Sequence, residues 1–193
     1  MCGRYYVDFT IVEEVNKLAP EWDRKLIAGA KRDIHPSEKA LVLVGQGDRV
    51  TAVSMAWGFT GYQGNGLLIN ARAEGVMERP TFRDSILHRR CVIPARGFYE
   101  WNKAKEKCTF YRKDSPVVWM AGCYKEVKGE NRFVIVTTSA NESVSGIHDR
   151  MPLILEQEEA QAWLLEDRSV EFLLQKTPVL LEREQEYEQM SLF

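Results

Sequence analysis

Four short segments of this 193-residue chain concentrate side chains that can do chemistry. They supply a thiol, an amide, carboxylates, an imidazole and several guanidinium groups, and they are Cys2–Tyr5, Asn70–Glu74, Gly97–Trp101 and His148–Pro152. Three of the four adjoin the end of a predicted strand, where functional sites are commonly presented. Taken singly each signal is weak, because an Arg-x-Glu pair is usually a solvated pair and a lone histidine is usually structural. Their combination is what needs an explanation.

Cys2 is the most reactive candidate. An initiator methionine is normally removed when the second residue is small, so the mature chain would begin with a cysteine. Its α-amine and thiol, with reference pKa values near 8 and about 8.5, would then sit on adjacent carbons. Such a 1,2-aminothiol attacks an aldehyde with the amine and closes a thiazolidine ring with the thiol. The neighbouring Arg4 would favour the thiolate. The alternative is that Cys2 is only a tolerated terminal residue.

The order of these segments resembles the SOS-response-associated peptidase (SRAP) family. The matching motifs are Met-Cys-Gly-Arg-Tyr, Asn-Ala-Arg-Ala-Glu, Arg-Arg-Cys-Val-Ile-Pro-Ala-Arg-Gly-Phe-Tyr-Glu-Trp and His-Asp-Arg-Met-Pro, with Trp57-Gly58-Phe59 and Phe82-Arg83 between them. They run from residue 2 to about residue 152, with weaker similarity to Trp163. Members of this family shield abasic sites in single-stranded DNA through a DNA–protein crosslink. One departure is the segment Asp33–Ser37, where family members commonly have an asparagine-containing turn before a proline.

The resemblance implies four catalytic residues, and each role also makes chemical sense. Cys2 is the nucleophile through its amine and thiol. Glu100 manages protons during crosslink formation and reversal. His148 acts as a general acid on the sugar ring oxygen, since imidazole exchanges protons near neutral pH. Asn70 orients the Cys2 terminus or the sugar by hydrogen bonds, because its amide has both donors and an acceptor.

The resemblance also implies contacts to DNA. Guanidinium groups suit phosphates, and the expected phosphate contacts are Arg4, Arg72, Arg83 and Arg150. Trp57 is expected to stack on a base beside the lesion, a contact that reads no sequence. Trp101 is a second aromatic candidate that could equally belong to the core.

The function that the resemblance implies is that of an abasic-site sensor. The protein would bind single-stranded DNA that contains abasic sites, including sites at single-strand to duplex junctions, and form a thiazolidine crosslink through Cys2. It would be a self-modifying enzyme of low turnover. Two alternatives stay open. One is a thiol peptidase or autopeptidase that uses Cys2, His148 and Glu100 as nucleophile, base and carboxylate. The other is a non-covalent module that binds modified or single-stranded DNA.

The charge of the chain is unevenly distributed. The formal net charge is −2, but residues 1–155 hold 23 Lys and Arg against 18 Asp and Glu, and residues 156–193 hold 3 against 10. The body is therefore basic and permits a polyanionic partner. We expect the acidic C-terminal portion to lie away from the DNA.

Composition narrows the class of protein further. No stretch approaches the ~18 apolar residues needed to span a bilayer, and no signal-peptide core follows the first residues. We expect a cytoplasmic, nucleoid-associated bacterial protein that acts as a monomer and needs no cofactor. The cysteines and histidines lack metal-ligand spacing, so no metal site is expected. Cys91, Cys108 and Cys123 lie in apolar runs and are predicted to be core residues.

Strands outnumber helices in the sequence pattern, without regular alternation, which indicates an α+β fold. Together with the resemblance, this predicts a single SRAP-like domain over residues 1–193, with a barrel-like core of mixed and antiparallel strands and peripheral helices. Residues 2–152 carry the motifs and residues 156–193 form an acidic helical C-terminal portion. Thr10 and Glu13 suggest a capping box for a first helix ending before Pro20. Predicted strands cover 40–44, 50–56, 67–70, 91–94, 97–101, 109–112, 117–124 and 132–138; predicted helices cover 80–87, 158–165 and 170–174; and 147–155 ends as a strand.

Overall fold

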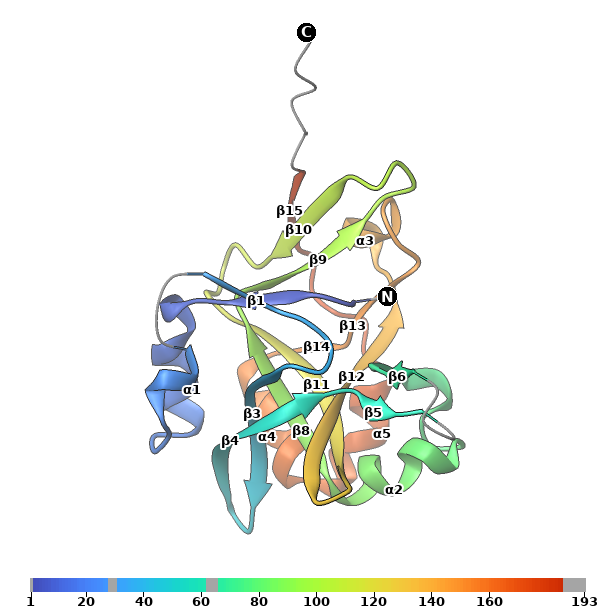
Figure 1. Cartoon of the computed structure of the whole chain (residues 1–193). Helices are drawn as coiled ribbons and strands as arrows, with labels where there is room; N and C mark the ends of the chain where they lie inside the picture. The colour runs from blue at the N-terminus through green and yellow to red at the C-terminus, as the bar shows by residue number, and fades with distance from the viewer. Residues whose placement is uncertain (1, 28–30, 62–65, 186–193) are drawn as a thin grey trace, which may run out of the picture.

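Five strands close on themselves at the centre of the protein (Figure 1). The computed structural model describes residues 2–27, 31–61 and 66–185. The closed sheet runs through β4 (Arg49–Trp57), β3 (Lys39–Gln46), β8 (Arg90–Ala95), β11 (Val118–Val127) and β12 (Glu130–Ser139). All pairings are antiparallel except the one that closes the ring, a short parallel contact between β12 and the end of β4. This barrel-like core, with helices around it, confirms the predicted α+β class.

Strand β12 brings two of the candidate segments to the same edge of the barrel. Its residues Ile135–Thr137 pair in parallel with β7 (Asn70–Arg72). Its residues Thr137–Ser139 pair with β13 (Arg150–Pro152), which follows His148. The segment 147–155, predicted to end as a strand, holds two short strands, β13 and β14 (Ile154–Leu155), and β14 pairs with β11. The short hairpin of β5 (Phe59–Thr60) and β6 (Leu67–Leu68) lies just before β7.

A second, antiparallel sheet has five strands in the order β15 (Glu182–Gln185), β10 (Lys107–Tyr111), β9 (Gly97–Trp101), β1 (Tyr5–Val7) and β2 (Arg32–Ile34). Side chains alternate between the two faces of a strand. Tyr5, Phe98 and Phe110 are fully buried on the inner face. The outer face carries Tyr6, Tyr99 and Trp101. This sheet holds the start of the chain next to Glu100.

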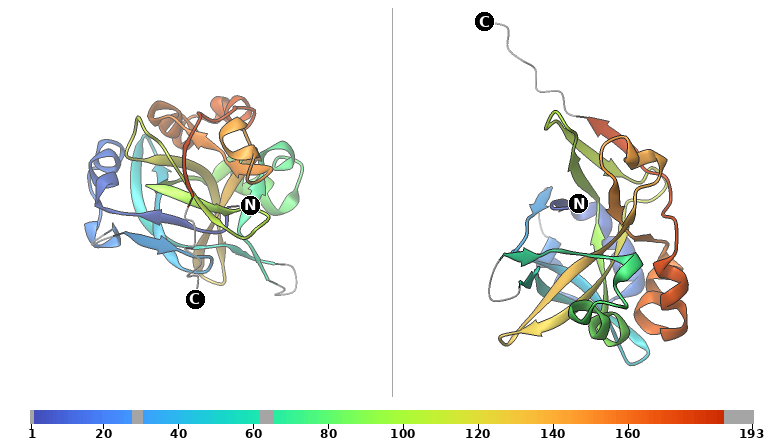
Figure 2. Two further views of the ribbon diagram at one scale, coloured as in Figure 1. Left: turned by 90° about the horizontal axis from the view of Figure 1, so that it is seen from above. Right: turned by 90° about the vertical axis from the view of Figure 1, so that its right-hand side faces the viewer.

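The helices lie at the periphery, as Figure 2 shows. They are α1 (Val12–Leu18), α2 (Pro80–His88), α3 (Glu142–Ser145), α4 (Gln157–Leu165) and α5 (Val170–Leu174), with short 3-10 turns at Phe9–Ile11, Arg24–Ile27, Ala73–Gly75 and Asp167–Ser169. The predicted capping box, with Thr10 as the capping residue, is wrong. Asp8 is the capping residue, and its side chain accepts the backbone N–H of Thr10. Among the described residues, no helix is long and apolar enough to cross a membrane.

The acidic C-terminal portion is part of the fold. The indole N–H of Trp163 in α4 donates to the carbonyls of Cys91 and Gly122, at 3.0 and 3.1 Å. A Cβ at Gly45 would lie 2.6 Å from the carbonyl oxygen of Leu164, so α4 needs a glycine there to approach β3. Strand β15 then adds its glutamates to the sheet that holds Glu100. Residues 182–185 thus belong to the second sheet, and the expectation that the acidic portion lies away from the DNA stays a prediction.

The cysteines expected in the core are confirmed there. Cys91, Cys108 and Cys123 are free thiols without solvent exposure. Burial raises the pKa of Cys123 to about 12, so this thiol stays protonated at neutral pH. These cysteines act as small apolar side chains.

Candidate functional site

Asn70 fixes the first described residue of the chain. Its Nδ2 donates to the backbone carbonyl of Cys2 at 2.9 Å, across 68 positions of sequence. Asn70 is the first residue of β7, so the parallel pairing of β7 with β12 sets its position. Its Oδ1 is buried and has no hydrogen-bond partner among the described residues. Asn70 therefore contacts the backbone of Cys2 and still has an acceptor to offer, and its role in orienting the Cys2 terminus or the sugar stays a prediction.

Glu100 is a buried carboxylate beside Cys2. Strand β9 turns it to the inner face of the second sheet, where the residue is only 4% exposed. Burial raises the pKa of its carboxyl, and the positive charge of a protonated His148 opposes that shift. A carboxyl with a raised pKa can take up and return a proton closer to neutral pH than an exposed glutamate can.

The Cys2 thiol is fully buried in the full-length chain. Burial, and next the negative charge of Glu100, raise the pKa of this thiol far above its usual value. A backbone hydrogen bond that involves Arg4 lowers this pKa, but its effect is smaller than those of burial and Glu100. The effect of Arg4 toward the thiolate is therefore outweighed by burial and by Glu100, and the thiol needs a proton acceptor.

His148 lies in the turn between α3 and β13, with its side chain 28% exposed. Its Nδ1 accepts the backbone N–H of Arg150 at 3.0 Å and lies 2.9 Å from an oxygen of Asp149. When Nδ1 accepts the Arg150 N–H, the single ring proton of the neutral imidazole is on Nε2. Since its charge acts on Glu100, His148 belongs to the same group of residues as Cys2, Asn70 and Glu100.

Arg150 does not reach a phosphate in this structure. Its guanidinium binds both carboxylate oxygens of Glu74, at 2.7 and 2.9 Å, and donates to the Thr137 carbonyl at 2.7 Å. The residue is only 8% exposed, and the ion pair lowers the pKa of Glu74. The predicted DNA contact is therefore wrong for this conformation. Arg150 instead ties the His148 turn to the segment that carries Asn70.

Trp57 is not a stacking platform either. It has no solvent exposure, its indole N–H donates to the Ile69 carbonyl at 3.0 Å, and its ring stacks on Phe133 at a centroid distance of 6.1 Å. Because no face of the ring is open, the predicted base contact is wrong at this position. Trp57 packs where β4 and β12 close the barrel, and its hydrogen bond holds the residue before Asn70.

Arg4 and Trp101 do lie together at the protein surface. The Arg4 guanidinium sits 5.0 Å above the Trp101 ring, and both residues are half-buried. Arg72 is exposed and shares one side of β7 with Asn70, because side chains alternate along a strand. Arg83 is exposed on α2, which Figure 1 draws at the far end from the amino terminus. The roles of Arg4, Arg72, Arg83 and Trp101 toward DNA stay predictions.

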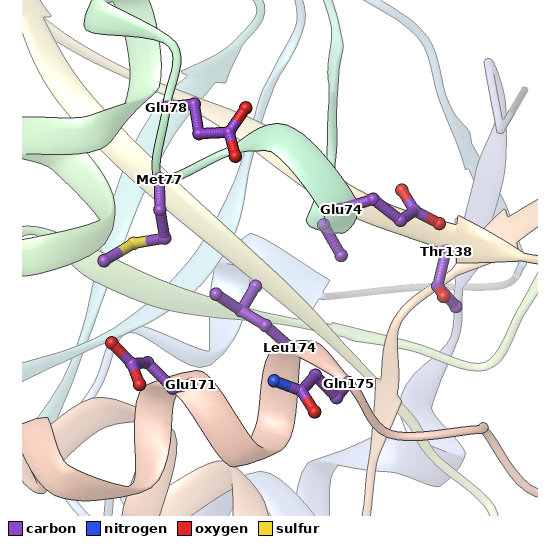
Figure 3. Close-up of a pocket in the computed structure, with 8 residues that line it drawn as sticks. Glu74, Met77, Glu78, Thr138, Glu171, Leu174 and Gln175 are labelled. Carbon is purple, nitrogen blue, oxygen red and sulfur yellow. The ribbon is translucent and has the colours of Figure 1, made fainter.

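A surface pocket of about 360 Å³ lies next to this group of residues and differs from it in charge. Figure 3 shows its lining by Glu74, Glu78 and Glu171, with Met77, Leu174 and Thr138 around them. The carboxylates of Glu78 and Glu171, and that of Glu74 paired with Arg150, make this pocket unfavourable for a phosphate group. No group of three or more His, Cys, Asp or Glu that could hold a metal is found in the described part of the chain.

Glu74 lies within a sequence motif, but the motif does not indicate that it pairs with Arg150. Glu74 belongs to the segment that we interpreted as a solvated Arg-x-Glu pair, yet its partner is Arg150, 76 positions away. No local pattern indicates such a partner. Lys31 and Lys107, whose ammonium groups lie over Tyr99, are also absent from the motifs.

The fold and this group of residues define a class: a β-barrel protein with a cysteine at the start of its chain, held beside a buried carboxylate and a histidine. The chain belongs to the SOS response associated peptidase (SRAP) family, whose model matches residues 1–191. It is similar to the abasic site processing protein YoqW of Bacillus subtilis, with 33% identity over 85% of this chain and 80% of that protein. It is also similar to the abasic site processing protein YedK of Escherichia coli, with 29% identity over 88% and 82%.

Solved structures agree on the fold. A crystal structure of a protein from Bacteroides thetaiotaomicron matches with a TM-score of 0.75 and 24% identity, covering 95% of this chain and 92% of that one. Another, from Bordetella bronchiseptica, matches with a TM-score of 0.77 and 19% identity, covering 96% and 100%. At these identities the likeness shows the shared architecture.

Proposed function

We propose that the protein recognises abasic sites in single-stranded DNA and links itself covalently to them through Cys2. The observation that carries this proposal is the hydrogen bond from Asn70 to the Cys2 carbonyl, which holds the start of the chain beside Glu100. Relatives named abasic site processing proteins support it. The protein would act as a monomer on DNA in the bacterial cytoplasm, including lesions at single-strand to duplex junctions.

The chemistry begins with removal of Met1, which frees the α-amine of Cys2. The amine attacks the aldehyde carbon of the ring-opened sugar, and loss of water gives an imine. The Cys2 sulfur then adds to the imine carbon, the thiol proton passes to the nitrogen, and a five-membered thiazolidine closes. The unpartnered Oδ1 of Asn70 would accept an N–H of the new amino terminus and aim its lone pair at the sugar.

Glu100 and His148 divide the proton transfers. Because the pKa of the buried Cys2 thiol is raised, sulfur attack needs a base, and Glu100 is the carboxylate whose charge acts on that thiol. His148, with its neutral-form proton on Nε2, would protonate the ring oxygen of the sugar and open it to the aldehyde. The Arg150 backbone N–H favours that tautomer, whereas the Asp149 carboxylate, 2.9 Å from the same Nδ1, favours a proton on Nδ1.

Selectivity follows from the lesion itself. An abasic sugar opens to an aldehyde, which intact nucleotides lack, and no base has to be flipped out. Phosphate contacts from residues such as Arg4 and Arg72 then supply position and salt-dependent affinity without reading sequence. A thiazolidine resists hydrolysis better than an open imine, and it avoids the β-elimination that an imine promotes. The crosslink would thus shield the strand from scission.

The test is a denaturing gel with an abasic single-stranded oligonucleotide. Wild-type protein should give a band that survives denaturation, and Cys2→Ala should lose it. Cys123→Ala, which removes a buried thiol from the barrel, should crosslink like wild type. Equal stable crosslinking by Cys2→Ala, or a crosslinked species whose mass still includes Met1, would show that the aminothiol mechanism is wrong.

A thiol peptidase is the second candidate, because Cys2, Glu100 and His148 are electrostatically coupled. A peptidase needs a thiolate, however, and the environment of Cys2 raises the pKa of its thiol. Turnover of a peptide library at enzyme-like rates, lost in Cys2→Ala, would favour this candidate. A purely non-covalent DNA-binding module would bind abasic and intact strands equally and form no crosslink at all.

A further inference from the structure

The outer face of the second sheet carries a continuous row of aromatic rings. Tyr6 of β1 stacks on Tyr99 of β9 at a centroid distance of 5.3 Å, and Tyr99 contacts Trp101 at 6.5 Å. The row lies on the other side of β9 from Glu100, since successive residues of a strand face opposite ways. The chain from Cys2 to Tyr6 spans at most ~14 Å. The row therefore begins next to the candidate site and leads away from it.

Three cations from three different segments lie on these rings. The Lys31 ammonium is 4.2 Å from the centroid of the Tyr6 ring and 5.3 Å from that of Tyr99. The Lys107 ammonium is 5.0 Å from the centroid of Tyr99, and the Arg4 guanidinium is 5.0 Å from that of Trp101. We call Arg4, Lys31 and Lys107, with the rings beneath them, the cation row. Residues 31, 4 and 107 come together only through the pairing of β2, β1, β9 and β10.

The two tyrosine rings of the row hold cations and are not open to nucleobases. Tyr99 is 1% exposed and Tyr6 is 7% exposed, so neither has a face open for stacking. The Tyr99 hydroxyl donates to Asp33 at 2.9 Å, which keeps the ring in its orientation. A cation seated on an aromatic face keeps its positive charge and loses part of its freedom. The surface is thus suited to phosphate groups rather than to bases.

The far edge of the same sheet has the opposite charge. Strand β15 places Glu182 and Glu184 beside β10, and the Tyr111 hydroxyl donates to Glu184 at 3.0 Å. A polyanion on this sheet is attracted to the side formed by β2, β1 and β9 and repelled from β15. This acidic edge therefore restricts a bound polyanion to the side of the sheet that contains β1, at the start of the chain.

We propose that the cation row binds the phosphodiester backbone of the single-stranded DNA that flanks the lesion. The proposal rests on the proposed function for the identity of the strand, and it adds a surface outside the group formed by Cys2, Asn70, Glu100 and His148. Contact by Lys31 and Lys107 is electrostatic and independent of sequence, so it contributes equally to abasic and intact strands.

Equilibrium binding to an intact single-stranded oligonucleotide tests the proposal without any covalent step. Neutralising two phosphate contacts by Lys31→Gln together with Lys107→Gln should reduce the slope of log Kd against log salt by about 1.4, since each contact contributes about 0.7. The matched control, Lys113→Gln with Lys128→Gln, removes the same charge from two exposed positions outside the row and should change the slope by much less.

Two further variants separate charge from folding. Lys31→Arg with Lys107→Arg should retain the wild-type slope, because the guanidinium keeps the charge and also stacks on rings. Glu184→Gln, on the acidic edge, should tighten binding at low salt. Thermal melting of each variant confirms that the fold is kept.

The two proposals fail in different ways. An unchanged salt slope in the Lys31→Gln, Lys107→Gln protein, with normal crosslinking by wild type, overturns the cation row and leaves the proposed function intact. A reduced salt slope in the Lys31→Gln, Lys107→Gln protein supports the cation row. If Cys2→Ala protein nevertheless crosslinks stably, the Cys2 chemistry is overturned and the row is kept. Binding of an acidic protein to the row, with no change in DNA binding, would assign the surface to another partner and overturn the proposal.

Discussion

The interior of the barrel and the outer face of the second sheet use similar side chains in opposite ways. On the inner side, Glu100 is buried, and Arg150 nearby in the barrel is held by Glu74 and a backbone carbonyl. On the outer side, the Arg4 guanidinium lies over the ring of the half-buried Trp101. A motif arginine or tryptophan can thus be a structural clamp or a surface contact. Burial and the partner decide between the two, and residue type does not.

The largest contrast is expected between the two tryptophans. Trp57→Ala removes a fully buried ring and the hydrogen bond to Ile69, and should lower the free energy of unfolding by roughly 3–5 kcal/mol. Trp101→Ala should cost about 1 kcal/mol or less, mainly the cation–π contact with Arg4. Urea denaturation of both variants measures the difference.

DNA binding should reverse that order. If Trp101 contacts a base beside the lesion, its loss weakens binding by about 1–3 kcal/mol, whereas a folded Trp57→Phe protein should bind as wild type does. A Trp57 variant that folds normally but no longer binds DNA would show that Trp57 opens its ring to a base after all, and the distinction between the faces would disappear.

A second contrast, between Glu74 and Glu78, is smaller. Both glutamates line the same pocket, but only Glu74 neutralises the buried Arg150. Glu74→Ala leaves that guanidinium without its carboxylate and should cost about 3 kcal/mol. Glu78→Ala removes the same charge from an exposed position and should stay within about 0.5 kcal/mol. Because Arg150 holds the His148 turn, Glu74→Ala should also slow crosslinking; equal melting temperatures for the two variants would contradict a clamp.

Motif identity was enough to predict which segments meet. Cys2, Asn70, Glu100 and His148 are separated by 146 positions, yet strand pairing places them together. The α+β class was also predictable, because strands dominate residues 39–139, whereas the barrel-like core was implied by the family resemblance. The prediction was possible because each short segment at a strand end contains its own reactive side chains, whatever its position in the sheet.

The errors have a common physical origin. Trp57 and Arg150 were assigned to DNA because their residue types suit bases and phosphates, but exposure is set by long-range packing. Trp57 is covered by Phe133, and Arg150 is neutralised by a glutamate 76 positions away. The cation row was invisible for the same reason, since residues 4, 31 and 107 become neighbours only in the folded sheet.

The smallest expected effect concerns the pH dependence set by Glu100. Burial raises the pKa of this carboxyl in the folded protein, so the folded state binds its proton more tightly than the unfolded chain does, whose pKa is about 4.3. The free energy of unfolding should therefore fall as pH rises from about 4.3 through the raised pKa of the folded state. The glutamine side chain of the Glu100→Gln variant cannot ionise, so its free energy of unfolding should not fall over this pH range. The variant should therefore be more stable than wild type at neutral pH. Urea titrations across that range, with the exposed Glu126→Gln as control, measure it.

The same variant connects stability to chemistry. If Glu100 accepts the proton of the Cys2 thiol, Glu100→Gln should be more stable and crosslink more slowly. The reason is that the buried carboxylate lowers the free energy of unfolding but serves the reaction as a proton acceptor. A Glu100→Gln protein that is less stable than wild type at neutral pH would mean that the carboxylate is compensated by its surroundings. The inner face would then resemble the outer one, where cations are stabilised by the rings beneath them.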